Sequence, residues 1–182
     1  EGEIVTAEEW DRADQTAQAA RLDPVAAQFL CGTVEQRISW TIGRRECSGT
    51  PDVRGVDRDG IPFLCDLKTT ADASPQRFPN FAMRSAYLGQ MAWYLHGIRQ
   101  AILPIPGRVV IVAVETKPPH AVAVYELTES ALALGDRTWR ALFERLMVCE
   151  ASEAWPGYAQ SPIMLDAPAD LALTIDGEEI EL

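Results

Sequence analysis

The chain has 182 residues, of which 47% are hydrophobic and 24% are charged, and its formal net charge at pH 7 is −11. This length suits one domain with a sizeable core, and the composition is ordinary for a globular protein. No apolar run approaches the ~20 residues needed to span a bilayer, and no signal peptide is visible, so we expect a cytoplasmic protein without a membrane segment. The acidic balance argues against a uniformly basic, nucleic-acid-binding surface.

The charge is unevenly distributed along the chain. Much of the acidic excess lies within residues 1–23 and 150–181. Several arginines instead lie in the middle of the chain: Arg44, Arg45, Arg54, Arg77, Arg84 and Arg99. Any one of them is an ordinary solvated side chain by default, but the asymmetry still allows a local phosphate-binding path.

Two helices and a strand are expected in the first forty residues. Residues 6–9, Thr-Ala-Glu-Glu, form a capping box that predicts a helix to about Ala20. Asp23-Pro24 predicts a second, short helix that Gly32 stops. Residues 34–40 alternate between polar and apolar side chains, which predicts a strand with Glu35 near its start.

A β-hairpin is expected between residues 50 and 68. A two-residue loop would pair Asp52 with Leu67 and leave the carboxylates of Asp52 and Asp66 on opposite faces. A three-residue loop with Gly60 in the left-handed conformation pairs Asp52 with Asp66 instead. Asp-Gly ahead of an apolar strand suits this bulged loop, so we predict it. The opposite face would form a core stripe of Val53, Ile61, Phe63, Cys65 and Leu67.

The chemistry of this hairpin lies at its end. Residues two apart on a strand share a face, so Asp66 and Lys68 point the same way. Two carboxylates and an ammonium could hold one divalent cation and one water. The structural alternative is a solvated strand end, because Asp-x-Lys is common and Pro-Asp is a frequent turn pair. Downstream, Gln90 and Tyr94 are four apart on a helix expected over residues 81–96, after a loop at 77–80.

The remaining elements complete an alternation of helices and strands. Residues 109–114 predict a strand buried on both faces, and residues 121–127 predict its partner. Thr128 caps a long amphipathic helix, and residues 171–182 predict a hairpin in a C-terminal extension. His96 and His120 are expected at the surface. The scattered cysteines predict reduced thiols rather than a zinc or iron–sulfur site.

The order of these motifs is more specific than any one of them. The order is Glu35, then Pro51-Asp52, then Asp66-Leu67-Lys68-Thr69, then Gln90 and Tyr94. It resembles the PD-(D/E)XK nucleases over roughly residues 5–150, and looks most like the RecE-type and lambda-type phage exonucleases and the RecB nuclease domain. The resemblance implies an α/β fold with a central mixed sheet flanked by helices, forming a single nuclease domain over residues 1–182, with the extension at about 151–182.

The resemblance also implies roles for these residues. Asp52 and Asp66 would ligate Mg²⁺ or Mn²⁺ with the Leu67 carbonyl, and Glu35 would add a further acid. Lys68 would orient or deprotonate the attacking water. The other two predicted residues, Gln90 and Tyr94, would steady the site or touch the DNA backbone.

The expected function is therefore metal-dependent exonuclease cleavage of double-stranded DNA, of phage recombination or repair type. RecE-like relatives form rings around DNA and hand single strands to a RecT-type annealing protein, so the resemblance implies a homo-oligomeric ring and such a partner. Two alternatives stay open: an endonuclease of the same superfamily, and a catalytically silent DNA-binding or structural subunit.

Overall fold

The computed structural model describes residues 5–159, 161–164, 172–175 and 178–181. It divides into two compact units, one extending to Glu144 and the other from Arg145 to Leu182. The boundary falls inside the long helix α4 (Glu129–Ser152). The division into a core to about residue 150 and an extension after it remains a prediction.

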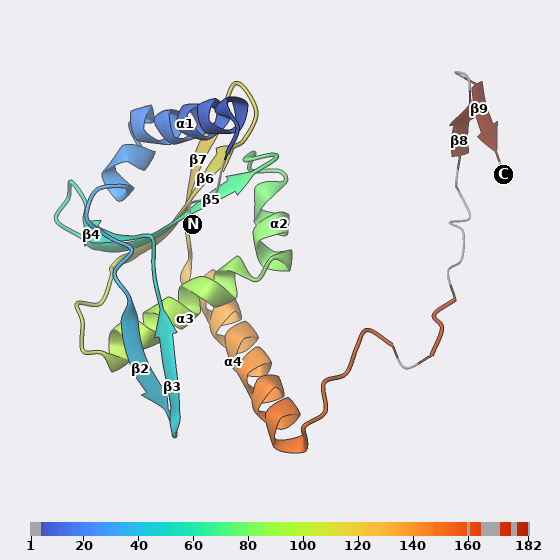
Figure 1. Ribbon diagram of the computed structural model, residues 1–182. Helices are drawn as coiled ribbons and strands as arrows, with labels where there is room; N and C mark the ends of the chain where they lie inside the picture. Colours follow the sequence, from blue (N-terminus) through green and yellow to red (C-terminus); the bar gives the residue numbers. More distant parts are fainter. Residues whose placement is uncertain (1–4, 160, 165–171, 176–177, 182) are drawn as a thin grey trace. The chain divides into compact units, whose positions relative to one another are not determined.

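The first unit is built on a mixed sheet (Figure 1). In the described part of the chain this sheet has five strands in the order β1-β4-β5-β6-β7. Their bounds are β1 (Thr33–Val34), β4 (Val53–Val56), β5 (Pro62–Thr70), β6 (Arg108–Glu115) and β7 (Val122–Glu126). The β5–β6 pair is parallel and the other pairs are antiparallel. With helices on both faces, this arrangement confirms the predicted α/β fold class.

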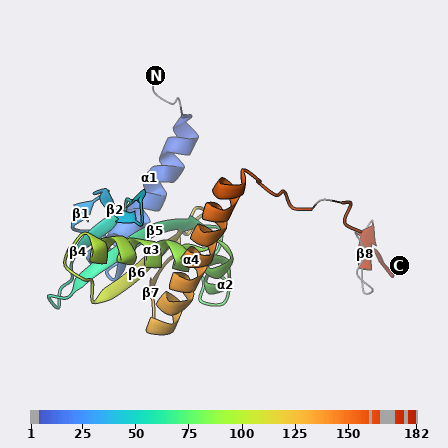
Figure 2. The same cartoon turned by 90° about the horizontal axis from the view of Figure 1, so that it is seen from below.

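Each face of the sheet has its own helical layer. Helix α1 (Ala7–Leu22) and the 3₁₀ helix η1 (Ala26–Phe29) cover one face, and α2 (Phe78–Arg84) and α3 (Tyr87–Gln100) cover the other (Figure 1). Figure 2, seen from below, shows α3 in front of the sheet. Helix α1 begins with the predicted capping box, in which the backbone N–H of Glu9 donates to Thr6 Oγ1 at 3.2 Å.

The β4–β5 hairpin has the predicted register. Val53 pairs with Cys65, and the same register continued by one residue sets Asp52 opposite Asp66. Gly60 has φ +79°, the left-handed conformation that the three-residue loop requires. Asp57 closes that loop, because its backbone N–H donates to the Ile61 carbonyl at 3.0 Å.

The core stripe expected on the hairpin is only partly correct. Val53, Phe63 and Cys65 are buried against η1, as predicted. Leu67, which we expected in the core, is 37% exposed. The reason is local packing, since a hollow of about 330 Å³ separates this end of β5 from α1 and Leu67 lines it.

The strand expected over residues 34–40 is not continuous. Glu35 has φ +49° and interrupts it, so β1 pairs with β4 while β2 (Ile38–Ile42) leaves the sheet. Strand β2 pairs instead with β3 (Arg45–Gly49) in a separate hairpin. That hairpin packs on α3, where the rings of Trp40 and Trp93 lie 4.7 Å apart.

The helix expected over residues 81–96 is two helices. Ala86, with φ +57°, separates α2 from α3, so α3 begins at Tyr87. The loop expected at residues 77–80 is wrong, because α2 already starts at Phe78. Pro79 fits there because the first turn of a helix needs no hydrogen bond from its N–H.

Strand β6 is buried on both faces as predicted, with every residue from Val109 to Val114 no more than 4% exposed. The surface position expected for His120 is wrong: it is 9% exposed. The turn that carries it folds back onto the sheet, and His120 Nδ1 lies 3.0 Å from the Glu115 carbonyl and 3.4 Å from Thr16 Oγ1 of α1. His96 is half-buried beside the ring of Trp139.

Helix α4 begins where predicted, since Thr128 Oγ1 accepts the backbone N–H of Ala131 at 3.2 Å. In the second unit, β8 (Ala172–Ile175) pairs antiparallel with β9 (Glu178–Glu181), which confirms the C-terminal hairpin. Its predicted turn at residues 176–177 and its ends at 171 and 182 lie outside the described residues. All four cysteines are free thiols. Among the described residues, no helix combines the length and apolar character required to cross a bilayer.

Candidate active site

The end of the β4–β5 hairpin brings two aspartates together. Asp52 directly precedes β4, and its Oδ2 accepts the backbone N–H of Leu67 at 2.7 Å. The Asp52 carbonyl in turn accepts the N–H of Glu35 at 2.9 Å. Asp52 is therefore fixed at both its side chain and its backbone, beside the strand that carries Asp66.

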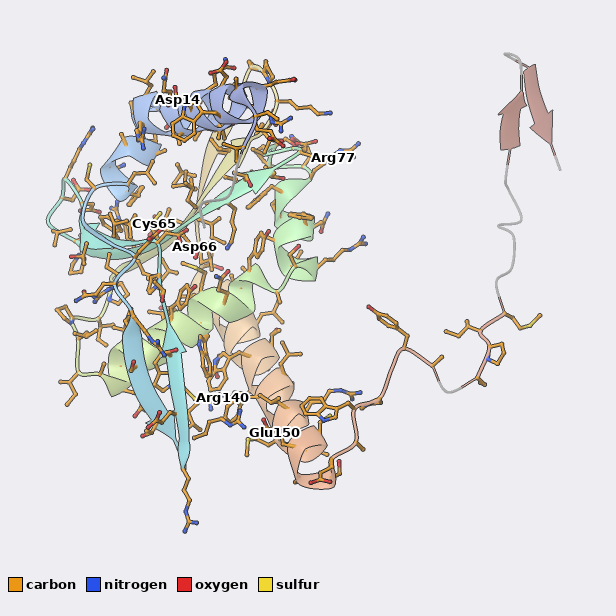
Figure 3. The ribbon with its side chains drawn as sticks, in the orientation of Figure 1. Asp14, Cys65, Asp66, Arg77, Arg140 and Glu150 are labelled. Carbon is orange, nitrogen blue, oxygen red and sulfur yellow. The ribbon has the colours of Figure 1, made fainter. Side chains whose placement is uncertain are left out.

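Asp66 is a buried carboxylate in the middle of the sheet (Figure 3), only 1% exposed. Burial raises its pKa above the ordinary aspartate value, the neighbouring Asp52 charge raises it further, and Lys68 opposes both. Lys68 Nζ lies 2.5 Å from Asp66 Oδ2. That oxygen is sealed from solvent, and the Lys68 ammonium compensates its charge. A buried carboxylate in a folded protein is paired in this way or ligates a metal ion.

Lys68 is held by groups from α3. Its Nζ donates to Gln90 Oε1 at 2.8 Å, and Gln90 Nε2 donates to the Tyr94 hydroxyl at 2.8 Å. The same ammonium lies over the ring of Tyr87, 4.6 Å from its centroid. Its side chain is 17% exposed, so the charge sits at the edge of solvent in a fixed position. The structure thus joins Asp66, Lys68, Gln90 and Tyr94 in one polar network.

Tyr94 ends this network under the second hairpin. Burial raises the pKa of its phenol, which keeps the hydroxyl protonated at neutral pH. Strand β3 lies directly on the ring: a Cβ at Gly49 would stand 2.7 Å from Tyr94 Cδ1. Beside it, Trp93 Nε1 donates to the Ser48 carbonyl at 3.1 Å. Glycine at position 49 therefore allows β3 to pack directly against the ring of Tyr94.

The structure does not bring the Glu35 side chain into this cluster. Glu35 is exposed, and only its backbone N–H reaches Asp52. Within the described residues, no three His, Cys, Asp or Glu side chains gather closely enough to hold a metal ion. Two aspartates, rather than three acids, therefore form the carboxylate set seen here.

These aspartates still fit a hard divalent cation. Mg²⁺ is typically held through one or two carboxylates and keeps several waters. Asp66 is buried beside Lys68, and the Asp52 carboxylate lies against the backbone of the next residue, Leu67, so both carboxylates lie at the same end of the hairpin. Leu67, whose carbonyl the resemblance implies as a further ligand, lies between Asp66 and Lys68 on β5.

One functional contact was missed from the sequence. Tyr87 has no role among the residues predicted for the site, yet its ring lies against the Lys68 ammonium. The contact exists because Ala86 breaks the helix and makes Tyr87 the first residue of α3. No local sequence signal marks that break.

Comparison with known proteins shows the family to which the chain belongs. Residues 2–165 match the model of a family described as "PDDEXK-like domain of unknown function (DUF3799)". The chain belongs to this family. The match spans most of the chain and includes both strands of the aspartate hairpin.

The fold is similar to that of a solved structure. A protein from Eubacterium rectale, whose crystal structure is described as a "Putative exonuclease", superposes with a TM-score of 0.69 at 15% identity. The alignment covers 92% of this chain, which spans 65% of that protein. A protein named SSO0001 aligns over 72% of this chain and 60% of its own, with a TM-score of 0.41 and 16% identity. No curated protein matches the chain significantly.

Proposed function

We propose that this PDDEXK-like chain is a divalent-metal-dependent deoxyribonuclease, acting on double-stranded DNA as an exonuclease. The observation that carries the proposal is the Asp52 carboxylate held at the backbone N–H of Leu67, between Asp66 and Lys68 on β5, with Lys68 held by α3. Carboxylates that can hold a divalent cation, with a fixed ammonium beside them, suit phosphodiester hydrolysis.

Asp52 and Asp66 would hold Mg²⁺ or Mn²⁺, with the Leu67 carbonyl as a further oxygen ligand. When bound, the cation would neutralise phosphate charge and make water a better nucleophile. The Glu35 carboxylate, which lies outside the cluster, stays a proposed additional acid.

The side chains around the cation would do the positioning. Lys68, as an ammonium, would hold the attacking water as the water adds to phosphorus and the bond to the leaving oxygen breaks; only as a neutral amine would it take the proton of the water. Gln90 would keep the ammonium pointed at the water, since its Oε1 accepts a hydrogen bond from Nζ. Tyr94, protonated at neutral pH, would fix the other end of the Gln90 amide.

Several finer features belong to the same proposal. The description of the Eubacterium rectale protein supports exonuclease over endonuclease action. The motif order supports a phage recombination or repair role, a homo-oligomeric ring around DNA, and a RecT-type annealing partner. A silent subunit is the weaker alternative, because Asp52, Asp66 and Lys68 are all present.

The test compares linear duplex DNA with a covalently closed circle of the same sequence, each with Mg²⁺, Mn²⁺ or EDTA. We expect metal-dependent release of nucleotides from the linear DNA and an intact circle. Asp52→Asn is the matched variant, and should lower the rate at least about 100-fold by removing a cation ligand. Cleavage of the circle would contradict exonuclease action and support the endonuclease alternative. If neither DNA were cleaved with either metal, the catalytically silent subunit would be the remaining interpretation.

A further inference from the structure

A hollow of about 440 Å³, lined mainly by polar and charged residues, opens where β5 meets α2. The side chains that matter in its wall are Thr70, Asp72, Arg77, Asn80, Phe81 and Arg84. Nothing in the proposed hydrolysis uses these residues. Their mixture of arginines, amides and one aromatic ring differs from the apolar packing elsewhere on this face of the sheet.

The hollow begins next to the proposed active site. Thr70 lies on the same face of β5 as Asp66 and Lys68, two residues beyond the lysine. A strand rises about 3.3 Å per residue, so this distance is roughly 7 Å. Duplex DNA rises ~3.4 Å per nucleotide, so the hollow begins within about two nucleotides of a phosphate bound at Lys68.

Aromatic contacts join the hollow to the lysine. The Phe81 ring packs edge-on against Tyr87, with centroids 5.9 Å apart and planes at 84°. Tyr87 in turn lies under the Lys68 ammonium. Phe81 is 47% exposed, so part of its ring is free to contact a ligand. An exposed aromatic ring in a charged groove is the typical platform on which proteins stack unpaired bases.

The charges of the hollow favour phosphate. Arg84 makes no ion pair in the part of the chain that the structure describes. Arg77, 79% exposed, lies 3.4 Å from Asp72, so the wall of the hollow contains two guanidinium groups and one carboxylate. Figure 3 shows Arg77 at the start of α2, on the side away from α3. The charged side chains of the hollow therefore carry a net positive charge, even though the formal net charge of the whole chain is −11.

We propose that this hollow receives one unpaired nucleotide of the substrate strand, next to the phosphate being cleaved. Phe81 stacks on the base, and Arg84 and Arg77 bind the flanking phosphates. The volume is near the lower end of ligand pockets, about 300–1,000 Å³, and suits one nucleotide rather than a base pair. The inference rests on the proposed function and names its substrate class: DNA ends that offer unpaired nucleotides.

Binding can be tested without cleavage. Fluorescence anisotropy of a labelled ten-nucleotide oligo-dT, in EDTA, would give Kd for the wild type, Phe81→Leu and Arg84→Ala. Stacking on one base contributes about 1–3 kcal/mol, so we expect Phe81→Leu to weaken binding at least fivefold. Arg84→Ala should weaken binding and lower the salt dependence by the equivalent of about one phosphate contact.

The matched control is Arg21→Ala, an exposed arginine of α1 on the opposite face of the sheet, which should change Kd less than twofold. Thermal unfolding of each variant shows that the fold is retained. Phe81→Leu keeps an apolar side chain against Tyr87, so a loss of binding would report the stacking surface.

A second readout addresses the substrate class. Wild type should degrade duplexes with single-stranded overhangs faster than blunt duplexes, and Phe81→Leu should lose that preference. Oligo-dT binding that Phe81→Leu leaves within twofold would overturn the inference, as would equal losses in Arg21→Ala and Arg84→Ala. If binding depends on Phe81 but no DNA is degraded, the nucleotide pocket stands and the nuclease proposal fails.

Discussion

Strands β5 and β6 lie side by side at the centre of one sheet and are built in opposite ways. In their parallel register, Asp66 pairs with Ile111 and Lys68 with Ala113. β6 is apolar throughout its buried length, whereas β5 places two charged groups at the same depth. Burying a charge costs free energy unless a partner compensates it, so β6 is the strand that stability alone would select. β5 differs only where the proposed chemistry lies.

The largest effect that would sharpen this comparison comes from Lys68→Met. Methionine keeps the length and apolar stem of lysine but removes the ammonium, so the fold should survive. We expect DNA hydrolysis to fall about 1,000-fold, within the range of about 10²–10⁴ for a positioned proton-transfer group. Initial rates on linear duplex DNA with Mg²⁺ measure this. A variant that folds, binds DNA and cleaves at the wild-type rate would remove Lys68 from the mechanism.

The next largest effect concerns Asp66→Asn, which we expect to lower activity about 100-fold through loss of cation binding. Its stability should change in the opposite sense. Burial raises the folded-state pKa of Asp66 above its unfolded value, so the ionised carboxylate weakens the fold at neutral pH. The folded state of the wild type is least stable above the raised pKa, where Asp66 is ionised. It regains stability as the pH falls through the raised pKa towards the ordinary pKa of an aspartate. Without metal, Asp66→Asn should therefore unfold at a higher temperature than wild type at pH 7.

Adding Mg²⁺ or Mn²⁺ supplies the control for Asp66→Asn. A cation at 100 times its Kd stabilises a folded protein by about 2.7 kcal/mol. Wild type should gain such a shift in its unfolding temperature, and Asp66→Asn should gain little. Equal metal-induced shifts of the unfolding temperature in both proteins would show that Asp66 is not a ligand of the cation.

The smallest effect lies in β6. Ile111→Val removes one buried methylene opposite Asp66 and should cost about 0.5–1.5 kcal/mol of folding free energy. DNA hydrolysis at a temperature where both proteins are folded should stay within about twofold of wild type. Urea unfolding and initial rates together measure the contrast. A loss of activity as large as that of Asp66→Asn would mean that the two strands do not divide stability and chemistry between them.

The features that sequence analysis predicted are those set by local rules. The register of the β4–β5 hairpin followed from loop length and Gly60, and it places Asp52 opposite Asp66. The two-sided burial of β6 followed from the apolar pattern of residues 109–114, whereas the fold class followed from the resemblance that the motif order carries. Gln90 and Tyr94 were paired by helical spacing and do share a hydrogen bond.

Apart from the exposure of Leu67, the main features that were missed depend on non-glycine residues with positive φ. Glu35, Ala86 and His120 all adopt this conformation, which side chains disfavour and which only tertiary contacts can stabilise. At Glu35, the backbone bond to the Asp52 carbonyl ends β1 and turns the carboxylate away from the cluster. At Ala86, the helix break gives Lys68 its aromatic neighbour. Neither contact has a signature within a short window of sequence.

The close packing of Gly49 against the Tyr94 ring has an evolutionary consequence. Because β3 leaves no space for a side chain at position 49, the two positions are constrained to change together. A relative that gains alanine at 49 must accept a smaller residue at 94, and so give up the hydroxyl that anchors Gln90. Covariation between these sites would then track the integrity of the lysine's hydrogen-bonding support, even though position 49 itself contributes no functional group.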